Sequence, residues 1–243
     1  MVAAAAREIR DGELVFVGMR LPMLAFLVAR RTHAPQAIGL FENGVLRETP
    51  SPELLYTMGD PPNLLGATLC GQMLDVMGIL QQGRVHVGFL GAAEVDKFGN
   101  LNTTWGYRNR EMQRLPGSGG GCDIACLAQR TVVLLVHDRG RLVEHIGHIT
   151  SPGFGTGSGW RSRQGLQPGT GPSAVITTLG VMRFGKDGEA YLHSVHPTVS
   201  VDEVVANTGW ELRIAEDLVE TPPPTAQELS VMRELDPNHF WTR

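Results

Sequence analysis

The spacing of two short apolar runs constrains the fold of this chain most. Residues 13–18 (ELVFVG) and 37–41 (AIGLF) are apolar almost throughout, and Pro22 opens a helical stretch between them that extends to His33. A strand, a helix and a strand within about thirty residues form a βαβ unit, in which the two strands lie parallel. Continuous apolar character is typical of parallel strands that are buried on both faces. The sequence therefore predicts an α/β fold with an open, largely parallel sheet and helices on both faces.

The same reading assigns elements along the rest of the chain. It predicts helices over residues 3–11, 69–82, 200–207 and 225–235, and strands over residues 131–137 and 173–184. Residues 85–96 are expected to form a strand and its exit loop, and residues 151–171 a long Gly-rich loop. The sequence shows no internal repeat and no domain linker. A single domain over residues 1–243 is therefore expected.

Composition excludes several classes of protein. The 243 residues carry a formal net charge of −4, which argues against a nucleic-acid surface and gives no sign of a basic membrane patch. Neither a signal peptide nor an apolar run long enough for a spanning helix is recognisable. The odd number of cysteines, 3, suggests no disulfide framework. We expect a cytoplasmic protein with no nucleic-acid or membrane partner.

Glu42 is the first candidate for chemistry. It ends the second apolar run and is followed at once by Asn43 and Gly44, a pair typical of a tight turn. Ligands of open parallel sheets bind beyond the carboxyl ends of the strands, where this carboxylate falls. The alternative is a carboxylate that caps the next helix through exposed backbone amides.

Two further segments contain residues suited to a ligand site. Residues 115–125 (LPGSGGGCDIA) form a Gly-rich loop before an expected helix, a source of free backbone N–H groups. In residues 89–105, Gly91 and Ala92 permit close approach by a ligand, and Asn100 and Asn102 lie in a turn. Each segment could also be merely a tight loop. Together with the strand-end glutamate they provide a nucleophile, amide donors and small residues.

Evidence for a metal site is weak. Cys122 and Cys126 are four residues apart, and His145 and His148 lie near His137, but neither set has the ligand spacing of a structural zinc site. Buried cysteines usually act as small hydrophobic residues. No bound metal is expected.

In the order of its motifs the chain resembles the B subunits of class I coenzyme A-transferases, and most of all the glutaconate CoA-transferase B subunits. The motifs that carry this resemblance are VGMRLPMLAFLVARRTHAP (17–35), FLGAAEVDKFGNLNTT (89–104), GSGGGCDIA (117–125), ITSPGFG (149–155), VITTLGVMRF (175–184), HPTVSVDEVVANTGWEL (196–212) and ELDPNHF (234–240). The local spelling FENG is instead similar to the ketoacid transferases, in which the glutamate is followed by Asn-Gly. The identity of the acid substrate therefore stays open among glutaconate, branched or aromatic relatives, 3-oxo acids and short fatty acids.

The resemblance implies a role for several residues. Glu42 matches the family's catalytic glutamate, on a turn made by Asn43 and Gly44. Gly119 and Gly120 match the Gly-rich motif whose amides help to form an oxyanion site, and Asn102 matches an asparagine near the active site. The reaction implied is ping-pong CoA transfer through an acyl anhydride and a glutamyl-CoA thioester, with coenzyme A thioesters as substrates and no permanently bound cofactor.

The resemblance also implies a partner, a CoA-transferase A subunit of similar fold. An αβ heterodimer, assembled into a heterotetramer or larger, is expected.

Two alternatives stay open: an acyl-CoA hydrolase or decarboxylase of the same fold, in which the glutamate tends to be replaced, and a non-catalytic ligand-binding subunit. An arginine of residues 108, 110 and 114 could pair with a substrate carboxylate or a CoA phosphate, or belong to an exposed basic loop. His33 and Trp105 are similar candidates.

Overall fold

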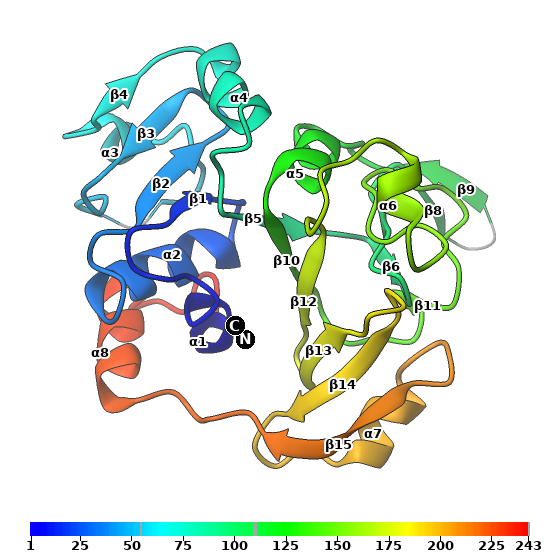
Figure 1. The fold of residues 1–243 in the computed structure, drawn as a ribbon. Helices are drawn as coiled ribbons and strands as arrows, with labels where there is room; N and C mark the ends of the chain where they lie inside the picture. Colours follow the sequence, from blue (N-terminus) through cyan, green and yellow to red (C-terminus); the bar gives the residue numbers. More distant parts are fainter. Residues whose placement is uncertain (54, 109–110, 243) are drawn as a thin grey trace. The chain divides into compact units, whose positions relative to one another are not determined.

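The chain forms two compact units in the computed structural model, which describes residues 1–53, 55–108 and 111–242. Unit 1 comprises Met1–Phe89 and Pro223–Arg243, and unit 2 comprises Leu90–Pro222 (Figure 1). The single domain expected over residues 1–243 stays a prediction.

Unit 1 contains the βαβ arrangement that the sequence predicts. Its strands are β1 (Leu14–Phe16), β2 (Ile38–Phe41), β3 (Val45–Arg47), β4 (Leu69–Cys70) and β5 (Val87–Gly91), the last of which runs into unit 2. They lie in the order β5-β1-β2-β3-β4. Strand β1 is parallel to both β2 and β5, with Val15 opposite Gly39 and Val87, whereas β3 and β4 are added antiparallel.

The helices of unit 1 pack around this sheet. They are α1 (Val2–Ala6), α2 (Leu21–Arg31), α3 (Pro61–Leu64), α4 (Met73–Gln81) and α8 (Ala226–Leu235). Helix α2 is buried from Pro22 to Arg30, which explains why its sequence is apolar on nearly every side.

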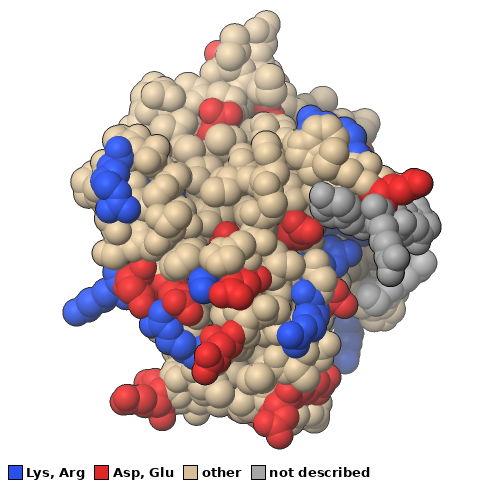
Figure 2. Space-filling model, turned by 90° about the vertical axis from the view of Figure 1, so that its right-hand side faces the viewer, with Lys and Arg blue, Asp and Glu red and all other residues tan. Residues whose placement is uncertain are grey.

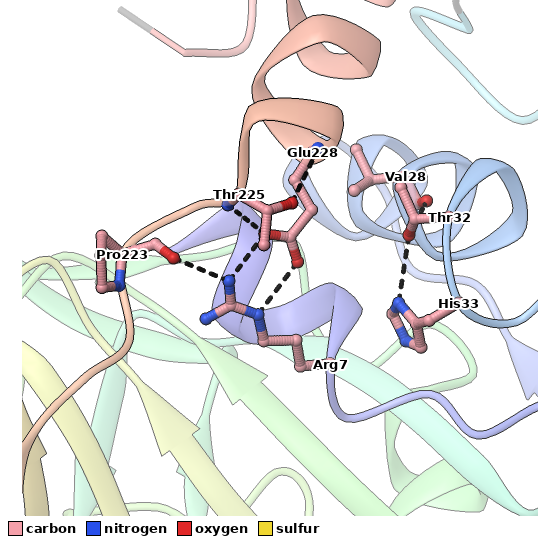
Figure 3. A network of polar contacts seen from close by, with 7 residues as sticks. All are labelled: Arg7, Val28, Thr32, His33, Pro223, Thr225 and Glu228. Atoms are coloured by element: carbon pink, nitrogen blue, oxygen red, sulfur yellow. Dashed lines mark hydrogen bonds and ion pairs between the residues drawn. The ribbon is translucent and has the colours of Figure 1, made fainter.

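A polar network fixes the C-terminal helix α8 to the start of the chain. The Arg7 guanidinium donates to both carboxylate oxygens of Glu228, at 2.9 and 2.6 Å, and to the carbonyl oxygen of Pro223 at 2.9 Å (Figure 3). Glu228 also accepts the backbone N–H of Thr225 as half of a capping box. The C-terminal helix therefore belongs to the same unit as the first strands.

Unit 2 is a mixed α/β unit. Its strands are β6 (Glu94–Asp96), β7 (Leu101–Asn102), β8 (Trp105–Arg108), β9 (Glu111–Arg114), β10 (Arg130–Leu134), β11 (Leu142–Val143), β12 (Pro172–Ile176), β13 (Gly180–Phe184), β14 (Ala190–Val195) and β15 (Arg213–Glu220), and its helices are α5 (Gly121–Leu127), α6 (Trp160–Arg163) and α7 (Val201–Ala206). The main strands follow the order β15-β14-β13-β12-β10, with β10 parallel to β12 and β14 parallel to β15. The predicted α/β class is confirmed, and antiparallel strands extend the parallel pairs in both units.

Several predicted elements differ from the structure, among them the helix over residues 3–11, which ends at Ala6. Residues 173–184 form two antiparallel strands, β12 and β13, because the Thr177 hydroxyl accepts the N–H groups of Leu179 and Gly180 and closes a turn. The predicted helix over residues 69–82 begins only at α4, after the short strand β4. The loop over residues 151–171 contains the one-turn helix α6.

Charges of both signs are interspersed on the surface. Arg213 pairs with Asp187 at 2.7 Å and with Glu189 at 2.5 Å, and blue and red side chains alternate over the lower part of the face in Figure 2. Across residues 1–53, 55–108 and 111–242, no helix has the length and apolar character needed to cross a membrane.

Candidate active site

The predicted site residues form two groups, one in each compact unit. Glu42, Asn43 and Gly44 belong to unit 1, and Gly91, Ala92, Asn102, Gly119 and Gly120 belong to unit 2.

Glu42 is half-buried and begins the connection from β2 to β3. Phe41 pairs with Val45 across this hairpin, and the Gly44 N–H donates to the Phe41 carbonyl oxygen at 3.0 Å. The nucleophile candidate therefore lies on a three-residue turn whose two ends are fixed by the sheet.

Gly44 gives this turn its shape. Its φ is +101°, and a Cβ atom at this position would lie 2.3 Å from the carbonyl oxygen of Gly71. The Gly71 N–H donates to the Gly44 carbonyl oxygen at 2.9 Å, so the two backbones are in direct contact. Only glycine fits both the dihedral angle and the contact.

The capping alternative does not account for α4, the next long helix. Gln72 and Asp75 form a complete capping box at its N-terminus. Capping of α4 therefore does not require Glu42, but the capping alternative stays open for α3, the next helix along the chain, whose N-cap residue Asp60 makes no side-chain capping hydrogen bond.

The predicted residues of unit 2 converge on the turn after β7. Gly91 ends β5 and is exposed, and a Cβ atom there would meet nothing closer than the Leu134 carbonyl oxygen at 3.9 Å. Internal packing therefore does not explain the glycine. Ala92 follows it, and the next residue donates its N–H to the Asn102 carbonyl oxygen at 3.1 Å.

Asn102 uses its side chain within the protein. The side chain is buried, its Nδ2 donates to Glu94 at 2.7 Å and to the Trp105 carbonyl oxygen at 2.6 Å, and its Oδ1 accepts the N–H groups of Thr104 and Trp105. This geometry favours a role in holding the turn rather than direct contact with a substrate.

The Gly-rich loop at residues 115–125 is hydrogen-bonded to the turn after β7. The Gly117 N–H donates to the Thr103 carbonyl oxygen at 2.8 Å, and a Cβ at Gly121 would lie 3.2 Å from the Ser151 hydroxyl. Gly119 is exposed with a φ of +48°, and Gly120 is the N-cap of α5. The loop thus leads into the start of a helix, beside the turn after β7, with Gly119 exposed and Gly120 buried.

Asn100 is a central structural residue whose role the sequence did not indicate. Its Oδ1 accepts the N–H groups of Gly153 and Gly155, and its Nδ2 donates to Asp96 and to the Gly155 carbonyl oxygen at 2.8 Å. Burial raises the pKa of Asp96, against the hydrogen bonds from Asn100 and Phe98 that lower it. In the sequence, the only local sign of this pair was that Asp96 and Asn100 fall within one turn. Asn100 joins the motif at residues 149–155 to the turn after β6.

Arg161 was also missed by the sequence reading. It is buried, and its guanidinium donates to the carbonyl oxygens of Gly153 and Ala125, each at 3.0 Å. Burial lowers its pKa. The sequence could not have predicted this role, because an arginine that donates to backbone carbonyl groups leaves no periodic pattern in the sequence.

The other basic and aromatic candidates are divided between the two units. The Arg114 guanidinium lies 5.0 Å from the Trp105 ring centroid and donates to the Thr104 carbonyl oxygen at 3.4 Å. Arg108 is on β8, and Arg110 lies outside the described residues. In unit 1, His33 contacts Thr32 at 3.1 Å (Figure 3).

The cysteine and histidine pairs have structural explanations. Burial and the neighbouring Cys122 raise the pKa of Cys126 to about 11. His137 is buried between the hydroxyls of Thr177 and Thr208, at 2.9 and 3.1 Å. Within the described ranges no three His, Cys, Asp or Glu side chains are grouped so that they could hold a metal ion.

The chain matches known proteins along nearly its whole length. The family model described as coenzyme A transferase matches residues 1–207. The B subunit of the 3-oxoadipate CoA-transferase of Pseudomonas knackmussii is 39% identical over 97% of this chain and 91% of its own length. The B subunit of the glutaconate CoA-transferase of Acidaminococcus fermentans is 32% identical over 96% of this chain and 89% of its own.

Solved structures show the same relationship. The crystal structure of glutaconate CoA-transferase from Acidaminococcus fermentans matches with a TM-score of 0.91 and 29% identity, over 100% of this chain and 95% of that one. The decarboxylase AibA/AibB matches with a TM-score of 0.83 and 30% identity, over 98% and 94%. The chain belongs to the coenzyme A transferase family, and along nearly its whole length it is similar to B subunits of CoA-transferases.

Proposed function

We propose that this chain is the B subunit of a heteromeric CoA-transferase that moves CoA from an acyl-CoA thioester to a dicarboxylic acid through a covalent glutamyl-CoA thioester on Glu42. The observation that carries this proposal is the place of Glu42, on a rigid turn at the carboxyl end of a central parallel strand. In a family of CoA-transferases, a carboxylate at this place is well suited to attack a thioester.

The chemistry proceeds in four acyl substitutions, two that consume the donor thioester and two that form the new one. A carboxylate oxygen of Glu42 attacks the acyl carbonyl of the thioester, and the CoA thiolate leaves as an acyl anhydride forms. The thiolate then attacks the Glu42 carbonyl carbon and releases the donor acid as its carboxylate. The acceptor carboxylate then attacks the glutamyl-CoA thioester and forms a new anhydride with Glu42 as the CoA thiolate leaves. The thiolate attacks the acyl carbonyl of this anhydride, which releases the new acyl-CoA and regenerates Glu42.

Each of these additions places negative charge on a former carbonyl oxygen. We assign its stabilisation to the backbone amides of Gly119 and Gly120, since preorganised N–H donors of this kind can contribute ~3 kcal/mol each. Asn102 would hold the adjacent turn, and Gly91 and Ala92 would leave room for the CoA arm. Arg114, stacked on Trp105 beside this loop, is a candidate for pairing with the second carboxylate or a CoA phosphate.

The names of the relatives support the proposed substrate class and partner. The two B subunits described above are named for 3-oxoadipate and glutaconate, both dicarboxylates. Because those proteins are B subunits, we propose an A subunit as the partner of this chain, in an αβ heterodimer assembled into a heterotetramer or larger, in the cytoplasm.

Steady-state kinetics of the complex tests the reaction. A ping-pong enzyme gives parallel double-reciprocal plots when the acyl-CoA and the acid are varied together. The Glu42→Gln variant should lose turnover by at least about three orders of magnitude, since an amide cannot attack the thioester. The exposed Glu211→Gln change should leave turnover unchanged.

The structural similarity to AibA/AibB keeps decarboxylation as a second candidate, and hydrolysis by an admitted water as its variant. These reactions consume the acyl-CoA without an acceptor acid. Release of CO2 with the thioester intact, or release of free CoA and the donor acid, without any added acid would replace the transferase proposal. A non-catalytic subunit would show no effect of Glu42→Gln on ligand binding.

A further inference from the structure

One carbonyl group connects the Glu42 turn to helix α3. The Met58 carbonyl oxygen accepts the side-chain Nδ2 of Asn43 at 2.8 Å and that of Asn63 at 2.7 Å. Asn43 follows Glu42 directly, whereas Asn63 lies on α3. The carbonyl therefore bridges the turn that carries the proposed nucleophile and a segment some twenty residues further along.

Arg47 fixes the other end of the same segment. It is 2% exposed and lies at the end of β3, the strand that returns from the Glu42 turn. Its guanidinium donates to the carbonyl oxygens of Thr49 at 3.0 Å, Pro50 at 3.0 Å and Asn63 at 2.5 Å. The β2–β3 hairpin is thus hydrogen-bonded to residues that follow β3 in the chain. Arg47 makes these contacts at the base of the hairpin, and Asn43 makes one at its tip.

Asn63 is an unusual residue for a buried position. It is 0% exposed, and its Oδ1 atom is buried without a hydrogen-bond partner among the described residues. An unmatched buried polar atom costs stability, and an apolar side chain would fill the same space without that cost. The bond from Nδ2 to Met58 is the contact that such a replacement would lose.

We propose that Asn63 is a positioning residue for Glu42, acting through the Met58 carbonyl and Asn43. This inference rests on the proposed function, since it takes Glu42 as the nucleophile. With Asn63 and Arg47 in place, the Met58 carbonyl is held still and anchors Asn43, and the turn presents the Glu42 carboxylate in one orientation. Without Asn63 the Met58 carbonyl keeps, of these two amides, only that of Asn43 as a partner. It is then less well fixed, and the Glu42 turn moves with it.

The expected kinetic signature is a loss of kcat with little change in KM. A displacement of a reacting group by about 1 Å can reduce the rate about 100-fold. The proposed function assigns the CoA arm to residues other than Glu42, so the orientation of Glu42 should affect its binding little. A purely structural role would instead lower the fraction of folded enzyme and leave kcat per folded molecule unchanged.

The test uses the A–B complex with Asn63→Asp, a substitution of nearly the same shape that has no N–H to donate to Met58. We expect kcat per folded complex to fall roughly 10- to 100-fold with KM within about twofold. The exposed Asn43→Ala variant should show a similar loss. The double variant should be no slower than the slower single variant, because both act through one carbonyl.

The matched control is Asn207→Asp. The Asn207 side chain also donates from Nδ2 to a backbone carbonyl, that of Glu203 at 2.9 Å, but at the end of α7 in unit 2. It should keep wild-type kcat. Wild-type kcat in Asn63→Asp, or losses that add in the double variant, would overturn the proposal.

If Asn63→Asp does not fold, Asn43→Ala decides the outcome, and wild-type kcat in that variant overturns the proposal. Glu42→Gln measured in parallel separates the two hypotheses. Full activity of Glu42→Gln would refute the proposed function, whereas an inactive Glu42→Gln with a fully active Asn63→Asp would refute only the positioning role.

Discussion

Gly44 shows how one residue sets the geometry of the proposed nucleophile. Its positive φ and the contact with Gly71 act together, since a Cβ atom would be strained by the first and would clash through the second. Glu42 and Asn43 inherit their positions from this turn. The residue that matters most for the place of the carboxylate therefore has no side chain.

Gly44→Ala should lower the free energy of unfolding by roughly 2–4 kcal/mol, from backbone strain plus the clash with the Gly71 carbonyl. Gly12→Ala is the matched control, since Gly12 has a φ of +76° but nothing within 4 Å of a Cβ atom. It should lose only about 1 kcal/mol. Equal losses in urea denaturation would show that the contact with Gly71 contributes nothing.

His137 gives the protein a pH dependence that can be measured. Burial lowers its pKa to about 4, below the ordinary value of 6.5. Between these values the unfolded chain binds a proton that the native protein does not, so stability is full above pH 6.5 and falls as the pH drops towards 4. His137→Gln should flatten the decrease in unfolding free energy over this range by on the order of 1 kcal/mol. The exposed His148→Gln change should not, and identical pH curves for the two variants would contradict the assignment.

At the scale of elements, unit 2 is held together by side chains that bind loop carbonyl groups. Arg161 connects the end of α5, through Ala125, with Gly153 in the motif at residues 149–155. Asn100 connects the same motif with the turn after β6, since its Nδ2 donates to the Gly155 carbonyl oxygen and its Oδ1 accepts the Gly153 N–H. These contacts hold the Gly-rich loop next to the turn after β7.

Arg161→Lys should lower the free energy of unfolding by about 2 kcal/mol or more, because an ammonium group cannot reach carbonyl groups on both sides and leaves some of them unmatched. Arg163→Lys is the control, because the Arg163 side chain is exposed and, in the part of the chain that the structure describes, donates only to the Ser158 carbonyl oxygen, at 3.4 Å. Its free energy of unfolding should stay within about 0.5 kcal/mol of the wild-type value. Similar midpoints for both variants in chemical denaturation would refute the role given to Arg161.

The elements of this fold differ in how well the sequence predicts them. The βαβ unit and the place of Glu42 at a strand end could be predicted, because continuous apolar runs and a proline-started helix are local signals. The turn between β12 and β13 was not predicted, since it is closed by the Thr177 hydroxyl, which accepts the N–H group of Gly180, and a single glycine in an apolar run is a weak turn signal. Contacts such as Asn63 with Met58 join irregular segments and have no periodic signature.

At the scale of the whole molecule, the proposed chemistry needs more than this chain. The proposed nucleophile and its supporting network belong to unit 1, and the amide-rich loop belongs to unit 2. The relatives are B subunits, so we expect turnover only when an A subunit is present. The catalytic properties of the chain should therefore be measured on the assembled complex.

The most direct test of the central claim is the intact mass of this chain in the complex after incubation with an acyl-CoA and no acceptor acid. We predict a species heavier by one CoA moiety, removed by borohydride or by an added acid and missing in Glu42→Gln. Thioester that disappears while this chain keeps its unmodified mass would contradict covalent transfer through Glu42.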